Sequence, residues 1–266
     1  MSKEKEEVIP VAAATLMLIR DGADGLEVFM VERHHQIDFA TGALVFPGGK
    51  VDKADFAPGV RERCENASQF NDLDLALRVA GIREAFEECG VLLAHDAGGS
   101  GLVTAQRLLG LEHYRKKLVD GEVTMLDFLL KEDLVLLPSA LVHFAHWITP
   151  PMVPKRFDTH FFIIEAPIDH IALHDGHESV DSVWIKPAKV IEEGDAGRRT
   201  VIFPTRLNVQ KLGRSNTVAE AMATARESKV VTVRPEMIKR EDGPYLKIPE
   251  EAGYDLSIYP LPAGRG

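Results

Sequence analysis

The segment from Leu73 to Leu93 constrains the fold more than any other part of this 266-residue chain. Its apolar residues recur three or four positions apart, which is the spacing of one face of an α-helix. They are Leu75, Val79, Ile82, Phe86 and Val91. Gly90 stands where such a helix could end. Because a helix with one apolar face must bury it, we expect this segment to cover part of a core.

The same segment contains the string Arg83-Glu84-Ala85-Phe86-Glu87-Glu88. Glu87 and Glu88 follow Glu84 by three and four residues, so a helix places the three carboxylates on one face. Their mutual repulsion costs stability unless cations bind there, and hard divalent cations prefer oxygen ligands. For an isolated string of this kind, a solvated glutamate-rich face is the commoner alternative.

Stretches with strand character and further helical stretches surround this helix in mixed order. The expected strands are 11–19, 25–31, 42–46, 141–148, 159–165 and 182–185, with short strand-like pieces after residue 230. Additional helices are expected at 104–118, 123–131, 187–193 and within 208–226. Turns are expected at 20–24 and, because of two adjacent glycines, at Pro47-Gly48-Gly49. This order predicts an α/β or α+β layered domain, without a clean boundary for a second one.

Composition and charge limit the functional classes. The formal net charge is −10 and long Lys/Arg runs are absent from the sequence, which disfavours a nucleic-acid partner. Two cysteines without metal-ligand spacing favour a reducing compartment. The apolar run from Val8 to Ile19 is too short to span a membrane. We therefore expect a cytoplasmic protein that binds a phosphorylated small molecule through divalent metal ions.

The glutamate string and its neighbours resemble the Nudix box, G-x5-E-x7-R-E-U-x-E-E-x-G-U, in which U is aliphatic. Gly49 corresponds to the first glycine. The second half of the box is matched by Arg83, Glu84, Glu87, Glu88, Gly90 and Val91. Asp55 stands where the box has its first glutamate, and the distance from there to Arg83 is about twenty residues too long. An insertion thus splits the box.

One branch of the Nudix hydrolases carries an insertion at this place, and its mammalian members are peroxisomal coenzyme A diphosphatases. The segments that resemble this branch are 44–49, 82–93, 147–150 and 154–162, with Glu178 six residues before Trp184. The resemblance implies a Nudix-type α/β/α sandwich with a mixed β-sheet between helices. We expect a single domain over 8–266, with insertions at about 54–72 and 95–133 and a C-terminal extension at about 213–266.

The resemblance also implies a metal-dependent hydrolase that attacks a phosphorus atom of a diphosphate with metal-activated water. Glu87 and Glu88 would be the principal ligands of Mg²⁺ or Mn²⁺, helped by the backbone carbonyl of Gly48. Glu84 would bind metal or act as general base. Arg83 would orient the glutamates rather than contact substrate.

Other acids are candidates for a further catalytic carboxylate. Glu178 is the first choice and Asp181 the reserve, although a charged residue in a polar loop is equally compatible with a solvent-facing role. Asp55 and Asp52 are candidates to replace the missing glutamate of the first half of the box.

Basic side chains and histidines complete the set of candidates. Arg33, Lys155 and Arg156 are possible contacts to the substrate phosphates, since guanidinium and ammonium groups pair with phosphate oxygens. A structural ion pair is the alternative for Arg156. His143 and His146 have a spacing that invites a metal site, but a regular strand points them to opposite faces, so we exclude one.

The leading hypothesis is hydrolysis of coenzyme A or an acyl derivative. A second is hydrolysis of ADP-ribose or a dinucleotide such as NADH, because substrate choice lies outside the box. A non-catalytic, metabolite-sensing Nudix domain is the alternative from another class. In each case the partner is a small nucleoside diphosphate derivative, with no nucleic acid or membrane and a possible homodimer. The terminal residues lack a Ser-Lys-Leu address, which favours a cytoplasmic location.

Overall fold

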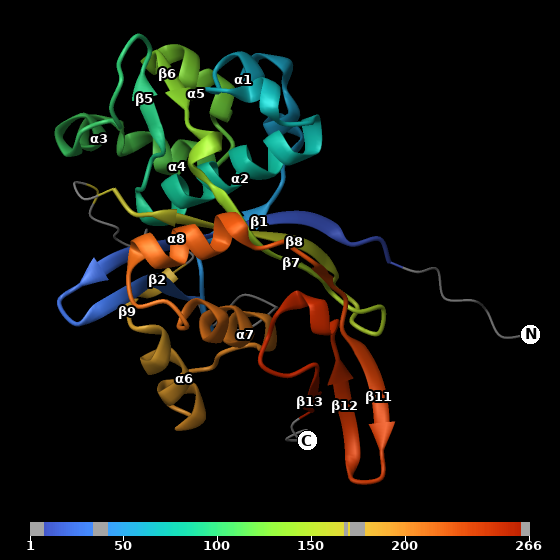
Figure 1. Ribbon diagram of the computed structural model, residues 1–266. Coiled ribbons are helices and arrows are strands. Elements are labelled where there is room, and N and C mark those ends of the chain that lie inside the picture. Colours follow the sequence, from blue (N-terminus) through green and yellow to red (C-terminus); the bar gives the residue numbers. More distant parts are fainter. Residues whose placement is uncertain (1–7, 34–41, 168–169, 171–178, 262–266) are drawn as a thin grey trace, which may run out of the picture.

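A mixed eight-stranded sheet forms the middle layer of the structure (Figure 1), a computed structural model that describes residues 8–33, 42–167, 170 and 179–261. The strands of this sheet are β1 (Val11–Gly22), β2 (Gly25–Arg33), β3 (Leu44–Val45), β4 (Gly48–Lys50), β7 (Val142–Ile148), β8 (Phe157–Glu165), β9 (Ser179–Ile185) and β10 (Thr232–Val233). They run in the order β10-β7-β8-β1-β2-β3, with β4 also paired to β1 and β9 to β2. The pairs β1–β8 and β7–β10 are parallel and the others antiparallel.

Helices cover both faces of the sheet (Figure 1). One face carries α2 (Asp72–Cys89) and, beyond it, α1 (Pro58–Glu62), α3 (Ala105–Leu111), α4 (His113–Val119), α5 (Met125–Glu132) and a two-stranded sheet of β5 (Ala94–Asp96) and β6 (Leu134–Leu136). The other face carries α6 (Pro187–Asp195), α7 (Phe203–Leu212) and α8 (Val218–Glu227). The predicted α/β/α sandwich with a mixed sheet is confirmed.

Alternation along β1 divides the apolar residues between two cores. Leu16 and Leu18 face α2 and its neighbours, whereas Met17 and Ile19 face α6 to α8. All four side chains are completely buried. Burial on both faces explains why the first expected strand reads as a continuous apolar run rather than an alternating one.

Local capping sets the length of α2. The side chain of Asn71 accepts a hydrogen bond from the Asp74 backbone N–H at 2.9 Å and begins the helix. Gly90 has a left-handed conformation with φ of 68°, and the Val91 N–H donates back to the Ala85 carbonyl. The helix therefore ends at Cys89, four residues earlier than the expected segment, at the glycine that the sequence marks as a possible end.

The insertions form compact additions beside α2. Residues 54–72 contain the 3₁₀ helices η1 (Lys53–Phe56) and η2 (Ala67–Gln69) as well as α1. The helix expected at 104–118 is divided at Glu112 into α3 and α4. The rings of Phe86 and Phe128 stack with centroids 5.3 Å apart, and Tyr114 packs on Phe128 at 4.7 Å. Aromatic contacts thus fasten the second insertion to α2.

The C-terminal segment contributes to the sheet layer as well as extending from it. In α8, Val218, Ala221 and Met222 are buried in the second core. β10 pairs with the edge strand β7. The remaining strands β11 (Glu236–Arg240), β12 (Gly243–Lys247) and β13 (Ile258–Pro260) form a separate antiparallel sheet. The 3₁₀ helix η4 (Glu250–Ala252) lies between β12 and β13 in the chain.

Both expected turns near the N-terminus are wrong in detail. β1 continues to Gly22, which pairs with Gly25 at the start of β2, so the turn is shorter than 20–24. Arg20 also pairs across the two strands with Glu27 at 2.8 Å. The segment expected to turn after Pro47 instead forms β4, which pairs with β1. None of the helices in the described residues is long and apolar enough to cross a bilayer.

The contact between α2 and β1 requires a small residue at Gly81. A Cβ atom there would lie 2.3 Å from Cδ1 of the buried Leu16. We predict that Gly81→Ala lowers the free energy of unfolding by roughly 1–2 kcal/mol, as overpacking outweighs the gain in helix propensity. Gly110→Ala in α3 is the matched control, since nothing lies within 4 Å of its Cβ position. Urea denaturation should show no loss for that control; equal stability of both variants would contradict close packing at Gly81.

Candidate active site

The glutamate face of α2 lies against β4. The carboxylate of Glu88 accepts a hydrogen bond from the Gly48 backbone N–H at 3.1 Å. Glu84 lies beside Gly49, since a Cβ atom added to Gly49 would be 2.3 Å from Glu84 Oε1. Glu87 and Glu88 are both buried. The structure therefore brings Glu84, Glu88 and Gly48 together from segments about forty residues apart in the sequence.

Glycine at position 48 permits this close approach. Its φ of 151° lies in a region that L side chains rarely adopt. A Cβ atom there would be 2.3 Å from the Ala14 carbonyl oxygen and 2.7 Å from Thr15 Cα, which are rigid backbone atoms. The double glycine is therefore needed to place β4 between β1 and the glutamates of α2.

Arg83 lies at the centre of the acidic group. Its guanidinium donates to Glu84 at 2.9 Å, to both carboxylate oxygens of Glu87 at 3.3 Å, and to the Lys50 carbonyl at 2.9 Å. It also forms a two-pronged pair with Asp55 at 3.1 and 3.2 Å. Burial would lower the pKa of Arg83, but the carboxylates of Glu84, Asp55 and Glu87 outweigh it and raise this pKa above its ordinary range. Arg83 is thus permanently charged and orients its partners.

Asp55 occupies the place next to Arg83 despite the insertion. Its side chain is fully buried and also accepts a hydrogen bond from the Asp52 backbone N–H at 2.8 Å, at the start of η1. Burial raises the pKa of Asp55, while Arg83 opposes the rise. Asp52, by contrast, is 65% exposed and 3.7 Å from Arg83. Of the two aspartates considered for the missing glutamate, Asp55 makes the closer contact.

The donor set fits a hard divalent cation. Burial raises the pKa of Glu87 to about 7, with Arg83 lowering it and Glu84 raising it further. One guanidinium therefore does not balance the charge of the carboxylates gathered here. A cation bound to Glu84, Glu87 and Glu88 would supply the remaining positive charge and favour their ionised forms. The three residues offer the oxygen ligands that Mg²⁺ and Mn²⁺ prefer.

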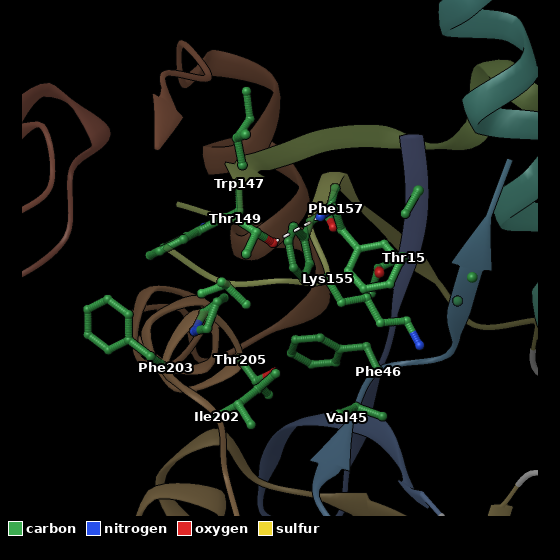
Figure 2. A pocket seen from close by; sticks show the side chains of 18 of the residues that line it. Thr15, Val45, Phe46, Trp147, Thr149, Lys155, Phe157, Ile202, Phe203 and Thr205 are labelled. Carbon is green, nitrogen blue, oxygen red and sulfur yellow. Dashed lines mark hydrogen bonds between the residues drawn. The ribbon is translucent and has the colours of Figure 1, made fainter. Parts of the chain in front are cut away.

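A pocket of about 520 Å³ has Glu88, Gly48 and Gly49 among its lining residues. Figure 2 shows other side chains that line it, among them Phe46, Trp147 and Lys155. Its walls come from β1, β7, β8 and α7 and are largely apolar; they include Phe46, Trp147, Val153, Phe157, Phe161 and Phe203. The pocket thus combines a metal-binding candidate, Glu88, with a mainly apolar lining.

Comparisons with known proteins agree with this geometry. The family model of the NUDT19 Nudix domain matches residues 60–209. The chain belongs to this family. The resemblance to Nudix hydrolases with a split box is thereby confirmed.

Similar proteins include the acyl-coenzyme A diphosphatases NUDT19 of Xenopus laevis and Homo sapiens. The first is 25% identical over 208 residues, which cover 63% of this chain and 54% of the relative. The second is 28% identical over 210 residues, covering 64% and 56%. The chain thus matches only about half the length of these curated relatives. The crystal structure of a Nudix hydrolase from Alicyclobacillus acidocaldarius superposes with a TM-score of 0.69 at 27% identity, covering 82% of this chain and 97% of that one.

Arg115 is a buried residue of this Nudix domain that sequence reasoning missed. Its guanidinium donates to the carbonyls of Glu87 and Glu88 at 3.1 and 3.0 Å, and to the Glu112 carboxylate at 2.6 Å. It therefore ties the second insertion to the end of α2 that carries the glutamates. A single arginine in an amphipathic helix gives no sign of such a tertiary contact.

The structure separates the basic candidates. Lys155 lines the pocket (Figure 2). Arg156 does not line it: the side chain is buried, with Nε donating to the Thr149 carbonyl at 3.0 Å and Nη1 to the Val8 carbonyl at 2.6 Å. The expected contact of Arg156 with substrate phosphates is therefore corrected: this residue joins two backbone segments. Its position before a strand did not show that its side chain turns inward.

Three other candidates stay predictions. Glu178 lies outside the described residues. Asp181 pairs through its backbone with Glu32, where β9 meets β2, and Arg33 is the last residue of β2. The proposed roles of Glu178, Asp181 and Arg33 therefore rest on the sequence resemblance alone.

The expectation that His143 and His146 point to opposite faces of a regular strand is wrong. An irregularity in the β7–β8 register between His143 and Ala145 breaks the alternation that a regular strand would have. The two rings lie 6.4 Å apart and both contact the His160 ring, at 5.0 and 4.0 Å between centroids. A β-bulge is invisible to an argument from period alone.

The pairing of Arg83 with Asp55 should govern stability as well as site geometry. We predict that Asp55→Ala lowers the free energy of unfolding by roughly 3 kcal/mol, because it leaves a buried guanidinium with fewer partners. Asp52→Ala should cost less than about 1 kcal/mol, as expected for an exposed and longer pair. Urea denaturation of both variants measures the difference. Similar losses would contradict the buried role of Asp55.

Proposed function

We propose that this Nudix chain uses Mg²⁺ or Mn²⁺ to hydrolyse the diphosphate linkage of coenzyme A or an acyl-coenzyme A. The observation that supports this most is the continuity between Glu88 and the apolar pocket. Coenzyme A joins a charged diphosphate to a long pantetheine arm, so its diphosphate suits a metal ion held by Glu88 and its arm suits the mainly apolar lining. The acyl-coenzyme A diphosphatases among the similar proteins point to the same substrate class.

The chain's own residues would share the work as follows. Glu87 and Glu88 hold the metal, with the Gly48 carbonyl as a further ligand, and Glu84 either joins them or takes the proton of the attacking water. When bound, the metal lowers the pKa of bound water and screens the phosphate charge. Arg83 holds Glu84 and Glu87 in place, since its guanidinium bonds to both. Lys155 pairs with a phosphate oxygen from the pocket wall.

The products follow from the bond that breaks. The water oxygen forms a new bond to one phosphorus atom, and the bond from that phosphorus to the bridging oxygen breaks. The bridging oxygen leaves with the other phosphate. With coenzyme A, the two products are adenosine 3′,5′-bisphosphate and phosphopantetheine.

Two alternatives are weaker. ADP-ribose or a dinucleotide would place a polar sugar or a second nucleotide against a mainly apolar wall, where unpaired hydroxyls are costly. A metabolite sensor without catalysis has no need of a buried carboxylate cluster, which repels itself without bound cations. The homodimer and the cytoplasmic location expected from the sequence stay predictions.

Removal of one metal-binding carboxylate tests the reaction. We predict that Glu87→Gln lowers kcat at saturating Mg²⁺ by at least about a hundredfold, because the amide keeps the shape of the side chain but loses its charge. The exposed Glu236→Gln is the matched control and should behave as wild type. The assay follows products from coenzyme A, acyl-coenzyme A, ADP-ribose, NADH and diadenosine polyphosphates. If wild type cleaves none of these compounds with Mg²⁺ or Mn²⁺, the result contradicts the proposed hydrolase activity and supports a metabolite sensor.

The position of Lys155 generates a second prediction. Lys155→Gln should raise KM for coenzyme A by roughly tenfold, with a smaller change in kcat, because one charge-assisted contact to phosphate is lost. The exposed Lys239→Gln, far along the chain in β11, controls for net charge. Steady-state kinetics at two salt concentrations should also show a weaker salt dependence for Lys155→Gln. An unchanged KM would remove Lys155 from the phosphate site.

A further inference from the structure

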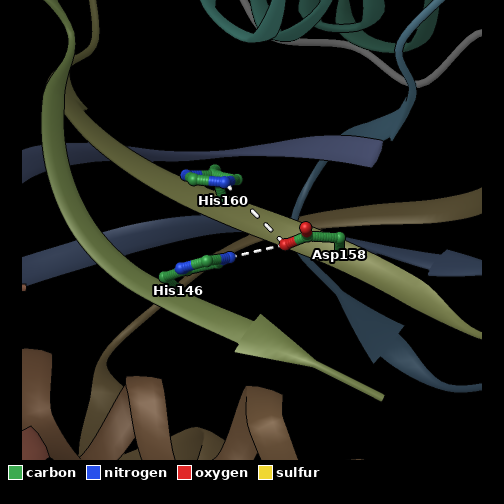
Figure 3. A group of neighbouring side chains, drawn as sticks. All are labelled: His146, Asp158 and His160. Carbon is green, nitrogen blue, oxygen red and sulfur yellow. Dashed lines mark hydrogen bonds and ion pairs between the residues drawn. The ribbon is translucent and has the colours of Figure 1, made fainter. Parts of the chain in front are cut away.

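A second group of metal-binding side chains lies away from the glutamates, on the neighbouring strands β7 and β8 (Figure 3). His146 is opposite His160 in the register of the two strands, and Asp158 precedes His160 by two residues. Each of the three offers one ligand atom, and these atoms all lie within 4.8 Å of one another. The Nudix box contains none of these residues.

None of the three residues lines the pocket, and on β8 Asp158 and His160 point away from the pocket-lining side chains. Phe157, Thr159 and Phe161 line the pocket, and Asp158 and His160 alternate with them along β8. On β7, Trp147 lines the pocket and is next to His146. The histidines therefore face the side of the sheet that carries α2 and are separate from the proposed substrate site.

The orientation of the rings directs one nitrogen of each histidine to a shared oxygen. Asp158 Oδ1 is 2.5 Å from His146 Nε2 and 3.9 Å from His160 Nε2. The opposite nitrogens have outer partners: His146 Nδ1 is 2.8 Å from the Thr232 hydroxyl, and His160 Nδ1 is 3.1 Å from His143 Nε2. Metal-binding histidines characteristically use their second nitrogen in this way, which fixes the ring and its tautomer.

We propose that His146, Asp158 and His160 bind a borderline divalent transition-metal ion of the Zn²⁺ type. Two imidazole nitrogens and one carboxylate oxygen form a softer set than three glutamates, so this site would differ in selectivity from the Mg²⁺ or Mn²⁺ site. Three protein ligands leave a fourth tetrahedral position for water. Ligand atoms around tetrahedral zinc lie about 3.3 Å apart, so the present spacings require only small side-chain movements.

The competing explanation is a hydrogen-bonded ladder without metal, in which His146 Nε2–H donates to Asp158.

A metal titration distinguishes the two explanations. The untagged chain is stripped of metal by a chelator and then titrated with Co²⁺ in the presence of excess Mg²⁺, which occupies the glutamates. We expect visible absorption of a histidine-bound Co²⁺ with one ion per chain. Zn²⁺ should displace the Co²⁺ and raise the melting temperature of the protein.

Variants assign the ion to these residues. His146→Gln and Asp158→Asn should each weaken Co²⁺ binding by at least about tenfold. His95→Gln, at a half-buried histidine of β5, is the matched histidine control, and Glu87→Gln should keep the absorption because it alters only the Nudix box. Circular dichroism in chelator checks that each variant is folded. Absence of Co²⁺ absorption in wild type, or binding unchanged in both His146→Gln and Asp158→Asn, would overturn the proposal and leave the hydrogen-bonded ladder.

Discussion

The guanidinium of Arg83 is the contact on which the candidate active site depends. It joins β4 through the Lys50 carbonyl, η1 through Asp55, and the glutamate face of α2 through Glu84 and Glu87. Without a central cation, these carboxylates would repel one another at hydrogen-bonding distance in a region of low dielectric. One guanidinium offsets only part of that repulsion. The same balance that holds the site together thus leaves it with negative charge for a metal ion.

Much of this site could be predicted from the sequence because it depends on local periodicity. Spacings of three and four on one helix place Glu84, Glu87 and Glu88 on one face whatever the rest of the fold does. The cap at Gly90 is local in the same sense. The double glycine Gly48-Gly49 marked a backbone feature correctly, although the feature is a strand that abuts the glutamates rather than a turn.

The contacts that sequence reasoning missed join distant segments. Asp55 is a candidate by its place in the box, but it lies far before Arg83 in the chain, so their pair depends on how the first insertion brings η1 against α2. Arg115 belongs to the second insertion and reaches the last carbonyls of α2 only through tertiary packing. In the sequence, Arg115 resembles an ordinary surface charge. The burial of Asp55 and Arg115 makes their contacts specific, since an unpaired charge there would be costly.

The histidines illustrate a different limit of sequence reasoning and a property of this sheet. The bulge in β7 adds one residue to the strand, which brings His143 to the same face as His146 while Trp147 keeps its place in the pocket. Strands β7 and β8 therefore present an apolar substrate wall on one face and a group of imidazoles on the other. Because alternate residues of one strand share a backbone, an ion that fixed His146 and His160 would also restrict Trp147, Thr159 and Phe161. Occupancy of the proposed second metal site would then act on the pocket through the strands themselves, without touching the substrate.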